Sequence, residues 1–193
     1  MKLIFATANL HKAKEAQAML LPRVQLIVPA DLGYTQEIPE TGNTLEDNAM
    51  QKARTIWDIF GLDCFADDTG LEVRALDGAP GVYSARYAGP QANAEANMAK
   101  LLSQLAGQTE RRAQFRCVIA LILNGAEYYF EGCVPGHILE APQGDKGFGY
   151  DPIFMPQGYD RSFALMDGRE KNAVSHRGLA LEQLARFLHL QQT

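Results

Sequence analysis

Apolar and polar residues follow two different spacings along the chain, one typical of strands and one typical of helices. The unbroken apolar run at residues 3–6 predicts a strand buried on both faces, and apolar positions recurring between residues 9 and 20 predict a helix that follows it after a short turn. Residues 24–28 predict a second strand. Residues 37–43 are polar and contain Pro and Gly, so we expect a loop there.

The clearest predicted helix lies between Thr44 and Gly61. Its apolar residues fall at helical spacing, Thr44 and Asp47 resemble a capping box with Asp in place of Glu, and Gly61 is a typical helix stop. Asn48 and Lys52, four residues apart, lie together on a flank of the apolar stripe.

The second half of the chain changes in character. After a predicted helix around residues 97–105, two apolar runs at 114–123 and 127–134 flank the dipeptide Asn124-Gly125, the strongest short signal for an antiparallel hairpin. Residues 180–188 predict an amphipathic closing helix. Helices mixed with both kinds of strand predict an α/β fold with a mixed sheet, whose two ends could enclose a cleft.

Length and composition predict a single domain over residues 1–193, of which 47% are hydrophobic and 21% charged. The formal net charge of −5 argues against a protein that coats nucleic acid, because such proteins contact many phosphates with Lys and Arg. No run approaches the roughly 18 apolar residues of a membrane span, and the short apolar run at the start is too brief for the core of a signal peptide. Three cysteines without metal-type spacing favour free thiols in a reducing compartment. We therefore expect a soluble, cytoplasmic protein.

The segment that joins the first strand to the first helix is a candidate anion site. Backbone N–H groups and the dipole at a helix start favour an anion, Thr7 and Asn9 add side-chain donors, and Lys12 adds a positive charge. The whole segment comprises Thr7, Ala8, Asn9, Leu10, His11 and Lys12. An ordinary helix cap with a solvated lysine explains these residues equally well, and the glycine pattern of a P-loop is absent.

Two adjacent acids, Asp67 and Asp68, follow an apolar run at residues 64–66 that predicts a strand ending at them. Carboxylates crowded at a strand end repel each other unless a cation or a shared proton relieves them, so the pair indicates a Mg²⁺ site or a carboxylate acting as base on water. Glu40, in the loop before the clearest helix, is a candidate third acid. The pair could instead cap the turn into Thr69. Adjacent acids do not match the D-x-D spacing of phosphatases that form an aspartyl phosphate.

Two further segments are suited to a nucleotide. Residues 146–152 form a glycine-spaced aromatic loop that could present backbone donors and a flat ring to a base, or could be a tight turn with buried aromatics. His176 and Arg177 stand at the start of the closing helix, where the dipole disfavours cations and a bound anion would remove that penalty. The alternative is a mildly destabilised helix start. The cations that would complete a metal and polyphosphate site are Lys12, Lys52 and Lys171.

Six segments, in this order, resemble those of the inosine triphosphate pyrophosphatase family, and together they span nearly the whole chain. They are TANLHK at 7–12, ETGNTLEDNAMQKA at 40–53, FADDTGLEV at 65–73, GAPGVYSARYAG at 78–89, GFGYDPIF at 147–154 and EKNAVSHRG at 170–178. Any one of them is a weak signal, but six in sequence at similar separations are highly specific.

The resemblance implies a fold and an activity. Members of that family have an elongated α/β fold, with a mixed sheet flanked by helices and two lobes around a central cleft, and they form homodimers. They cleave ITP, dITP and XTP to the monophosphate and pyrophosphate, and they need Mg²⁺. The chain is therefore expected to be an XTP/dITP diphosphatase that removes deaminated nucleotides from the precursor pool and has neither a nucleic acid nor a membrane as partner.

The resemblance also implies roles for individual residues. Residues 7–12 would hold the phosphates, Glu40 and Asp68 would bind the metal, and Asp68 would also be the base for the attacking water, with Asp67 and Lys52 supporting catalysis. The remaining residues expected to contact the substrate are Thr69, Phe148, Gly149, Tyr150, Asp151, Lys171, His176 and Arg177. An aromatic ring would stack on the base, and donors to its 6-oxo group would face the amino group of adenine and so reject ATP.

Two positions depart from the pattern of that family. Thr69 stands where serine is usual and keeps the hydroxyl group, and Ala8 stands where glycine is frequent and adds one methyl group beside the phosphate loop. Neither change touches the acids or the cations, although either could alter affinity.

Two other functions are consistent with parts of the pattern. A related pyrophosphatase directed at modified pyrimidine or ordinary nucleotides would turn over dTTP or UTP at comparable rates. A nucleotide-binding module without catalysis is disfavoured, because a binder gains nothing from acids crowded beside phosphate.

Overall fold

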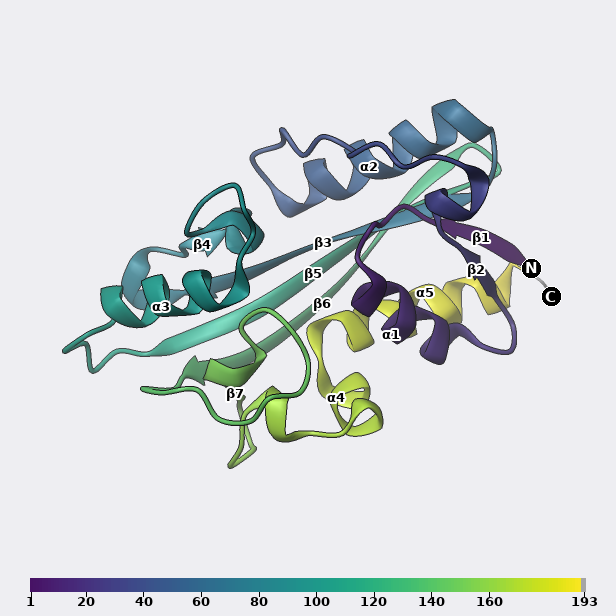
Figure 1. The fold of residues 1–193 in the computed structure, drawn as a ribbon. Helices are drawn as coiled ribbons and strands as arrows, with labels where there is room; N and C mark the ends of the chain where they lie inside the picture. The colour runs from purple at the N-terminus through teal and green to yellow at the C-terminus, as the bar shows by residue number, and fades with distance from the viewer. Residues whose placement is uncertain (192–193) are drawn as a thin grey trace. The chain divides into compact units, whose positions relative to one another are not determined.

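The computed structural model describes residues 1–191, which form five α-helices and a seven-stranded sheet (Figure 1). The helices are α1 (Leu10–Leu20), α2 (Leu45–Phe60), α3 (Ala94–Gln104), α4 (Gly168–Val174) and α5 (His176–Leu190). The strands are β1 (Lys2–Phe5), β2 (Gln25–Ile27), β3 (Cys64–Val73), β4 (Pro80–Gly81), β5 (Arg112–Leu123), β6 (Ala126–Ile138) and β7 (Phe154–Pro156). The strand order is β2-β1-β3-β5-β6-β7, with β4 paired to β3. Parallel pairs at β1 and antiparallel pairs at β4 and β7 confirm the predicted mixed sheet of an α/β fold.

The chain divides into two compact units. Unit 1 contains Met1–Asp68, Cys117–Gly132 and the chain from Arg177 onward, and unit 2 contains Thr69–Arg116 and Cys133–His176. Strands β3, β5 and β6 therefore contribute residues to both units.

Unit 1 is built around three parallel strands, in which β1 pairs with β2 and, through Ile4 with Cys64 and Phe5 with Phe65, with β3. Successive side chains of a strand point to opposite faces of a sheet. On one face the rings of Phe5 and Phe65 stack 4.4 Å apart and join a core that includes apolar residues of α1 and α5. On the other face the Sγ of Cys64 lies 3.2 Å from the carbonyl of Ala53 in α2. Figure 1 shows the same division, with α1 and α5 on one side of the strands and α2 on the other.

The strongest local signals in the sequence are confirmed. The side chain of Thr44 accepts the backbone N–H of Asp47 at 3.1 Å, and Gly61 ends α2 with a φ of 62°. The turn between β5 and β6 has φ values of 51° at Asn124 and 79° at Gly125, the left-handed conformation that a two-residue hairpin turn requires.

The predicted end of the third strand is wrong. β3 does not stop at residue 66 but continues as a ten-residue strand to Val73, where Leu71 pairs with Gly81 of β4. Asp67 and Asp68 therefore lie within the strand. Acids are poor strand formers in isolation, but here both carboxylates meet cations, so the strand continues through them.

Unit 2 has an aromatic core. The ring of Phe115 in β5 lies 4.6 Å from that of Phe154 and 4.5 Å from that of His176, and Phe154 in turn lies 5.3 Å from Phe163. Gly136 of β6 faces β7 so closely that a Cβ there would come within 2.4 Å of the Met155 carbonyl oxygen. This glycine lets the short strand β7 pair with β6.

Two predictions from composition can be compared with the structure. All three cysteines are free thiols, as expected. Within residues 1–191, none of the helices combines the length and the apolar character needed to cross a lipid bilayer.

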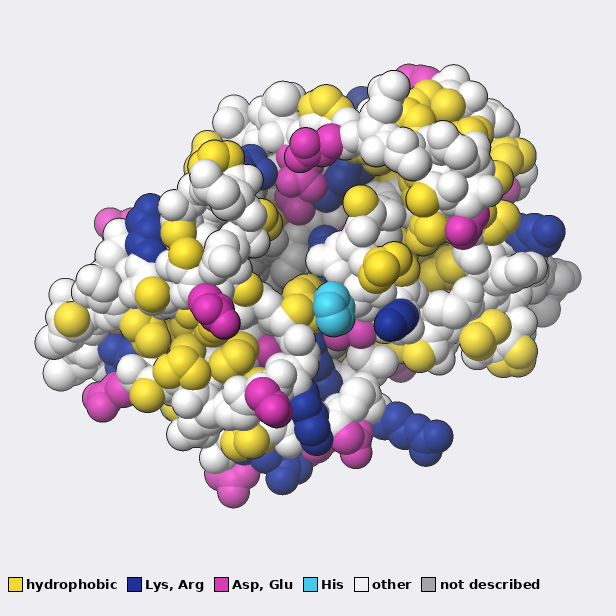
Figure 2. All heavy atoms as spheres, in the orientation of Figure 1, with side chains coloured by type: hydrophobic (Ala, Val, Ile, Leu, Met, Phe, Trp, Pro, Cys, Tyr) yellow, Lys and Arg dark blue, Asp and Glu magenta, His cyan; other side chains and the backbone are white. Residues whose placement is uncertain are grey.

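On the face drawn in Figure 2, Lys and Arg side chains (dark blue) are interspersed with Asp and Glu (magenta) rather than gathered into one basic surface.

Candidate active site

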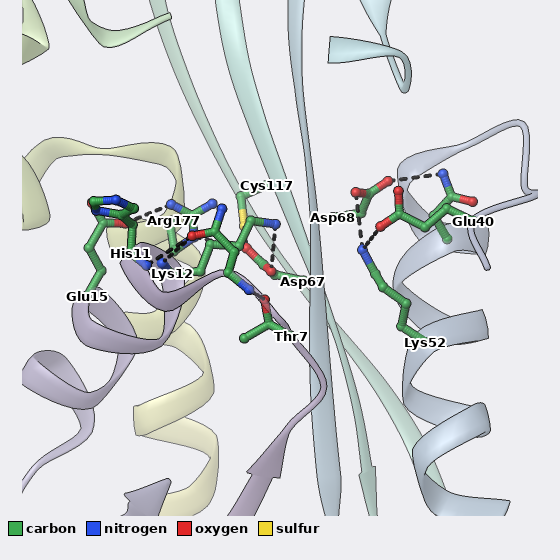
Figure 3. A network of polar contacts seen from close by, with 12 residues as sticks. Thr7, His11, Lys12, Glu15, Glu40, Lys52, Asp67, Asp68, Cys117 and Arg177 are labelled. Carbon is green, nitrogen blue, oxygen red and sulfur yellow. Dashed lines mark hydrogen bonds and ion pairs between the residues drawn. The ribbon is translucent and has the colours of Figure 1, made fainter. Parts of the chain in front are cut away.

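Strand β3 sends its two adjacent acids in opposite directions. Asp67 shares the face of Phe65, toward α1 and α5, whereas Asp68 shares the face of Cys64, toward α2 (Figure 3). The expected crowding of the two carboxylates is thus relieved by the pleat of the strand, and each carboxylate has its own set of partners within unit 1.

Asp67 is held between two cations. Its carboxylate accepts hydrogen bonds from the Nζ of Lys12 at 2.9 Å and from the Nε of Arg177 at 2.9 Å, and the Sγ of Cys117 lies 3.8 Å away. The Asp67 side chain is only 2% exposed. Burial by itself would raise the pKa of this carboxyl, but the charges of Lys12 and Arg177 outweigh it and hold the pKa well below its usual range. Asp67 is therefore a fixed negative charge at neutral pH.

Arg177 joins the start of α5 to α1. Besides Asp67, its guanidinium contacts the carboxylate of Glu15 in α1 at 2.7 Å, and its side chain is 3% exposed. Burial would lower the pKa of Arg177, but Asp67 and Glu15 are among the groups that raise it. Two carboxylates of the chain itself compensate the cation at this helix start, and the binding of an anion there stays a prediction.

The segment at residues 7–12 forms the N-terminus of α1. The side chain of Asn9 accepts the backbone N–H groups of His11 at 2.9 Å and of Lys12 at 3.3 Å, and the hydroxyl of Thr7 accepts the N–H of Asn9 at 3.1 Å. These bonds match the alternative of an ordinary helix cap. Ala8, Leu10 and His11 are exposed, and the phosphate-binding role of the segment stays a prediction.

Asp68 faces a second cluster on α2. The Nζ of Lys52 contacts both the Oδ1 of Asp68, at 3.3 Å, and the Oε1 of Glu40, and the side-chain amide of Asn48 donates to the Oδ2 of Asp68 at 3.1 Å. Burial raises the pKa of Asp68, and the charge of Glu40 raises it further, while Lys52 acts against them. The pKa values of the two neighbouring acids are therefore shifted in opposite directions, and Asp68 is the stronger base.

The two clusters are close enough to influence each other electrostatically. The charge of Lys12 lowers the pKa of Asp68, and the charge of Lys52 lowers the pKa of Asp67, in each case by less than the charges of the direct ion-pair partners do. The predicted grouping of acids and lysines in the first third of the chain is thus present in unit 1.

Glu40 and Asp68 offer a donor set that suits Mg²⁺. Mg²⁺ takes hard oxygen ligands and uses one or two carboxylates together with water and substrate phosphates. Both carboxylates reach the same ammonium group, that of Lys52, which shows that they converge on one position able to hold positive charge. Within residues 1–191, no three His, Cys, Asp or Glu side chains are grouped as a complete metal site. Two converging carboxylates fit an ion that takes its other ligands from water and phosphate oxygens.

A separate group in unit 2 contains the aromatic loop predicted for the base. The Oδ2 of Asp151 accepts the N–H of Phe148 at 2.8 Å and the Nζ of Lys171 at 2.7 Å, and this Nζ lies 4.7 Å from the centre of the Phe148 ring. A Cβ at Gly147 would come within 2.1 Å of the Asp151 carboxylate, so only glycine allows this turn. Lys171 lies in α4, a short helix that the sequence prediction did not include.

Two of the remaining predicted residues in unit 2, Tyr150 and His176, contact other residues of the same unit. The hydroxyl of Tyr150 donates to the carbonyl of Ser84 at 2.9 Å, burial raises the pKa of Tyr150, and His176 stacks on Phe115. Gly149 has a φ of 63°. Thr69 is half-buried in β3.

Sequence reasoning assigned no role to three residues that touch these groups, namely Glu15, Asn48 and Ser84. Asn48 could have been found from its spacing, because it lies four residues before Lys52 on the same flank of α2. Nothing local in the sequence distinguishes Glu15 or Ser84.

The sequence and the structure both match known proteins over nearly the whole chain. A model of the Ham1 family matches residues 3–187. Two proteins named dITP/XTP pyrophosphatase, from Christiangramia forsetii and Flavobacterium johnsoniae, are 50% and 49% identical to this chain over 188 residues, which cover 97% of it and 99% and 98% of their own lengths. The solved structure of the Staphylococcus aureus Ham1 protein is 38% identical, covers 99% of this chain and 100% of its own, and superposes with a TM-score of 0.90.

Proposed function

The chain belongs to the Ham1 family, and from that premise we propose that it hydrolyses dITP, ITP and XTP to the nucleoside monophosphate and pyrophosphate in a Mg²⁺-dependent reaction. Two of its relatives are named for dITP and XTP. The observation that carries the proposal is the convergence of Glu40 and Asp68 on Lys52, with the pKa of Asp68 raised.

The products show that the linkage between the α- and β-phosphorus is cut. In this proposal water forms a bond to the α-phosphorus while the bond from that atom to the bridging oxygen breaks, and pyrophosphate leaves. Asp68 takes the proton from the attacking water, because its raised pKa makes it a better base than an ordinary aspartate once it is ionised. Lys52, buried and charged, stabilises negative charge that develops on the phosphates beside Asp68.

Mg²⁺ held by Glu40 and Asp68 would neutralise phosphate charge and polarise the phosphorus toward attack. Lys12 binds phosphate oxygens at the N-terminus of α1, and Asp67 and Arg177 keep Lys12 and the start of α5 in place.

In this proposal the base is recognised by the group formed by Phe148, Asp151 and Lys171. The ring of Phe148 stacks on the purine, and Asp151 holds Lys171 and the backbone of Phe148 in one arrangement. Donor groups of this loop favour the 6-oxo group of hypoxanthine and xanthine. The 6-amino group of adenine would leave such a donor facing another donor, which costs about 1–3 kcal/mol and rejects ATP.

The test is to incubate the protein with dITP, XTP, ATP and dTTP in the presence of Mg²⁺ and to identify the products by chromatography. We expect pyrophosphate and monophosphate from dITP and XTP, and little product from ATP or dTTP. Orthophosphate as the first product, or equal rates on all four nucleotides, would overturn the proposal. The homodimer implied by the family resemblance and the cytoplasmic location expected from the composition stay predictions, and sedimentation velocity at two concentrations would check the first.

A further inference from the structure

The side chain of Asn48 links the strand that carries Asp68 to the loop that carries Glu40. Asn48 lies on α2 and is completely buried, with 0% exposure. Its Nδ2 donates to the Oδ2 of Asp68 at 3.1 Å, and its Oδ1 accepts the backbone N–H of Gly42 at 2.8 Å. Gly42 is two residues after Glu40 in the same loop, so one amide group holds both the strand that carries Asp68 and the loop that carries Glu40.

The loop approaches α2 as closely as its backbone allows. A Cβ at Gly42 would come within 2.5 Å of the Cβ of Asp47 and 2.8 Å of the Oδ1 of Asn48, so a side chain there would push the loop away. One residue earlier, the N–H of Thr41 donates to the Oε1 of Gln51 at 3.0 Å. Asn48 and Gln51, three residues apart on α2, therefore clamp two successive amides of the loop, but only Asn48 also reaches Asp68.

The chemistry of an amide suits this position. Glu40 and Asp68 carry like charges and converge on Lys52, so any shift of the loop changes the separation of the two carboxylates. A neutral amide both donates and accepts, whereas a carboxylate in its place could accept from Gly42 but not donate to Asp68. Asn48 fixes one oxygen of Asp68 and leaves the other directed at Lys52.

We propose that Asn48 is a positioning residue for the reaction, which sets the separation and orientation of the Glu40 and Asp68 carboxylates. This inference rests on the proposed function, in which those two carboxylates bind the metal and Asp68 activates water. Residues that orient metal ligands typically change metal affinity or activity by about 10 to 100-fold when they are replaced.

The test compares Asn48→Ser with Gln51→Ala, a matched control on the same helix that cuts the clamp on Thr41 but leaves Asp68 untouched. Three quantities are measured on each variant: kcat and KM for dITP, the dissociation constant of Mn²⁺ from the nucleotide-free protein by electron paramagnetic resonance, and the unfolding temperature. We expect Asn48→Ser to lower kcat and to weaken Mn²⁺ binding by about tenfold or more, with KM little changed. Gln51→Ala should change kcat and Mn²⁺ affinity much less.

A folded Asn48→Ser protein with native kcat and native Mn²⁺ affinity would overturn the proposal, as would an equal loss in Gln51→Ala. If Asn48→Ser does not fold, Gly42→Ala decides, because it keeps every polar group and only displaces the loop. Gly42→Ala should lower kcat and weaken Mn²⁺ binding as Asn48→Ser does. Native kcat and native Mn²⁺ affinity in Gly42→Ala would contradict the inference. Gly168→Ala, where a Cβ would meet nothing within 4 Å, is the control for a glycine replacement. If the native protein fails to hydrolyse dITP, the proposed function fails, whereas Mn²⁺ binding still reports on the role of Asn48.

Discussion

Two aspartates that are neighbours in the sequence have opposite electrostatic properties. Asp67 is fully buried, yet Lys12 and Arg177 keep its pKa low, whereas burial and Glu40 raise the pKa of Asp68. A depressed folded-state pKa means that ionised Asp67 stabilises the fold, and a raised one means that ionised Asp68 destabilises it. The residue proposed for the chemistry is thus the one whose charge opposes folding, as is common where function and stability compete.

The ion pair of Arg177 with Asp67 and Glu15 should be important for stability. Replacing Arg177 with Met removes one of the two cations that contact the buried carboxylate of Asp67, together with the partner of the half-buried Glu15, and breaking a buried pair in this way costs about 3–5 kcal/mol. Urea unfolding at pH 7 would measure this loss. Arg54→Met is the control, because Arg54 pairs with Glu127 at the surface, where its side chain is 59% exposed and the pair contributes about 1 kcal/mol at most. Equal losses in the two variants would contradict this account.

The contribution of Asp67 should depend on pH in a defined direction. An aspartate has an unfolded-state pKa of about 3.9, and the folded-state pKa of Asp67 lies below that value. Its stabilising effect is therefore complete above about pH 4 to 5 and is lost as the pH falls through the folded-state pKa. Unfolding free energies of the native protein and Asp67→Asn, measured from pH 7 down to pH 3, should converge as the pH falls. A constant difference would be inconsistent with an ionised Asp67.

At the scale of elements, the sequence predicts best where a helix or a turn carries its own signals. The bounds of α2 follow from Thr44 and Gly61, and the hairpin follows from Asn124-Gly125, because each of these residues acts through its own backbone. The helix α4 was missed because its seven residues contain no apolar stripe and its cap, Asp167, resembles many loop residues. β3 was cut short because the cations that allow acids inside it come from distant parts of the chain.

The cap of α2 should affect stability more than chemistry. The hydroxyl of Thr44 accepts the N–H of Asp47, and losing such a cap costs about 1 kcal/mol. Thr44→Ala should therefore unfold at lower urea concentration than Thr44→Ser, which keeps the hydroxyl. Both variants should retain the native kcat on dITP, since α2 keeps Asn48 and Lys52 in place through its packing. A large loss of kcat in Thr44→Ala alone would show that the cap also holds the site.

At the scale of the whole molecule, the candidate site depends on contacts that no local pattern encodes. Lys12 and Asp67 are 55 residues apart in the sequence, Arg177 and Asp67 are 110 apart, and Arg177 and Glu15 are 162 apart. The residue types were predictable from the six family-like segments. Their pairing was not, because it depends on which face of β3 each acid occupies, whereas the apolar run predicts a strand that ends at the acids.

Ligand binding should stabilise the folded protein if the carboxylate and lysine clusters bind phosphate and metal together. Pyrophosphate with Mg²⁺, at about 100 times its dissociation constant, should raise the unfolding free energy by about 2.7 kcal/mol. Differential scanning calorimetry with and without both ligands would measure the shift in unfolding temperature. Glu40→Gln should reduce the shift because it removes a proposed metal ligand, and an undiminished shift in that variant would exclude Glu40 from the site.

The central claim is that the two adjacent aspartates of β3, which point to opposite faces of the strand, have different roles. Asp67 stabilises the fold, and Asp68 takes part in catalysis. The most direct measurement compares Asp67→Asn with Asp68→Asn for both kcat on dITP and unfolding free energy at pH 7. We predict that Asp68→Asn lowers kcat by about 10² to 10⁴-fold, as loss of a general base does, while its stability is unchanged or higher. Asp67→Asn should instead lower the unfolding free energy by about 3 kcal/mol and retain most of the native kcat. The reverse ranking, or equal effects of the two substitutions on both quantities, would contradict the account.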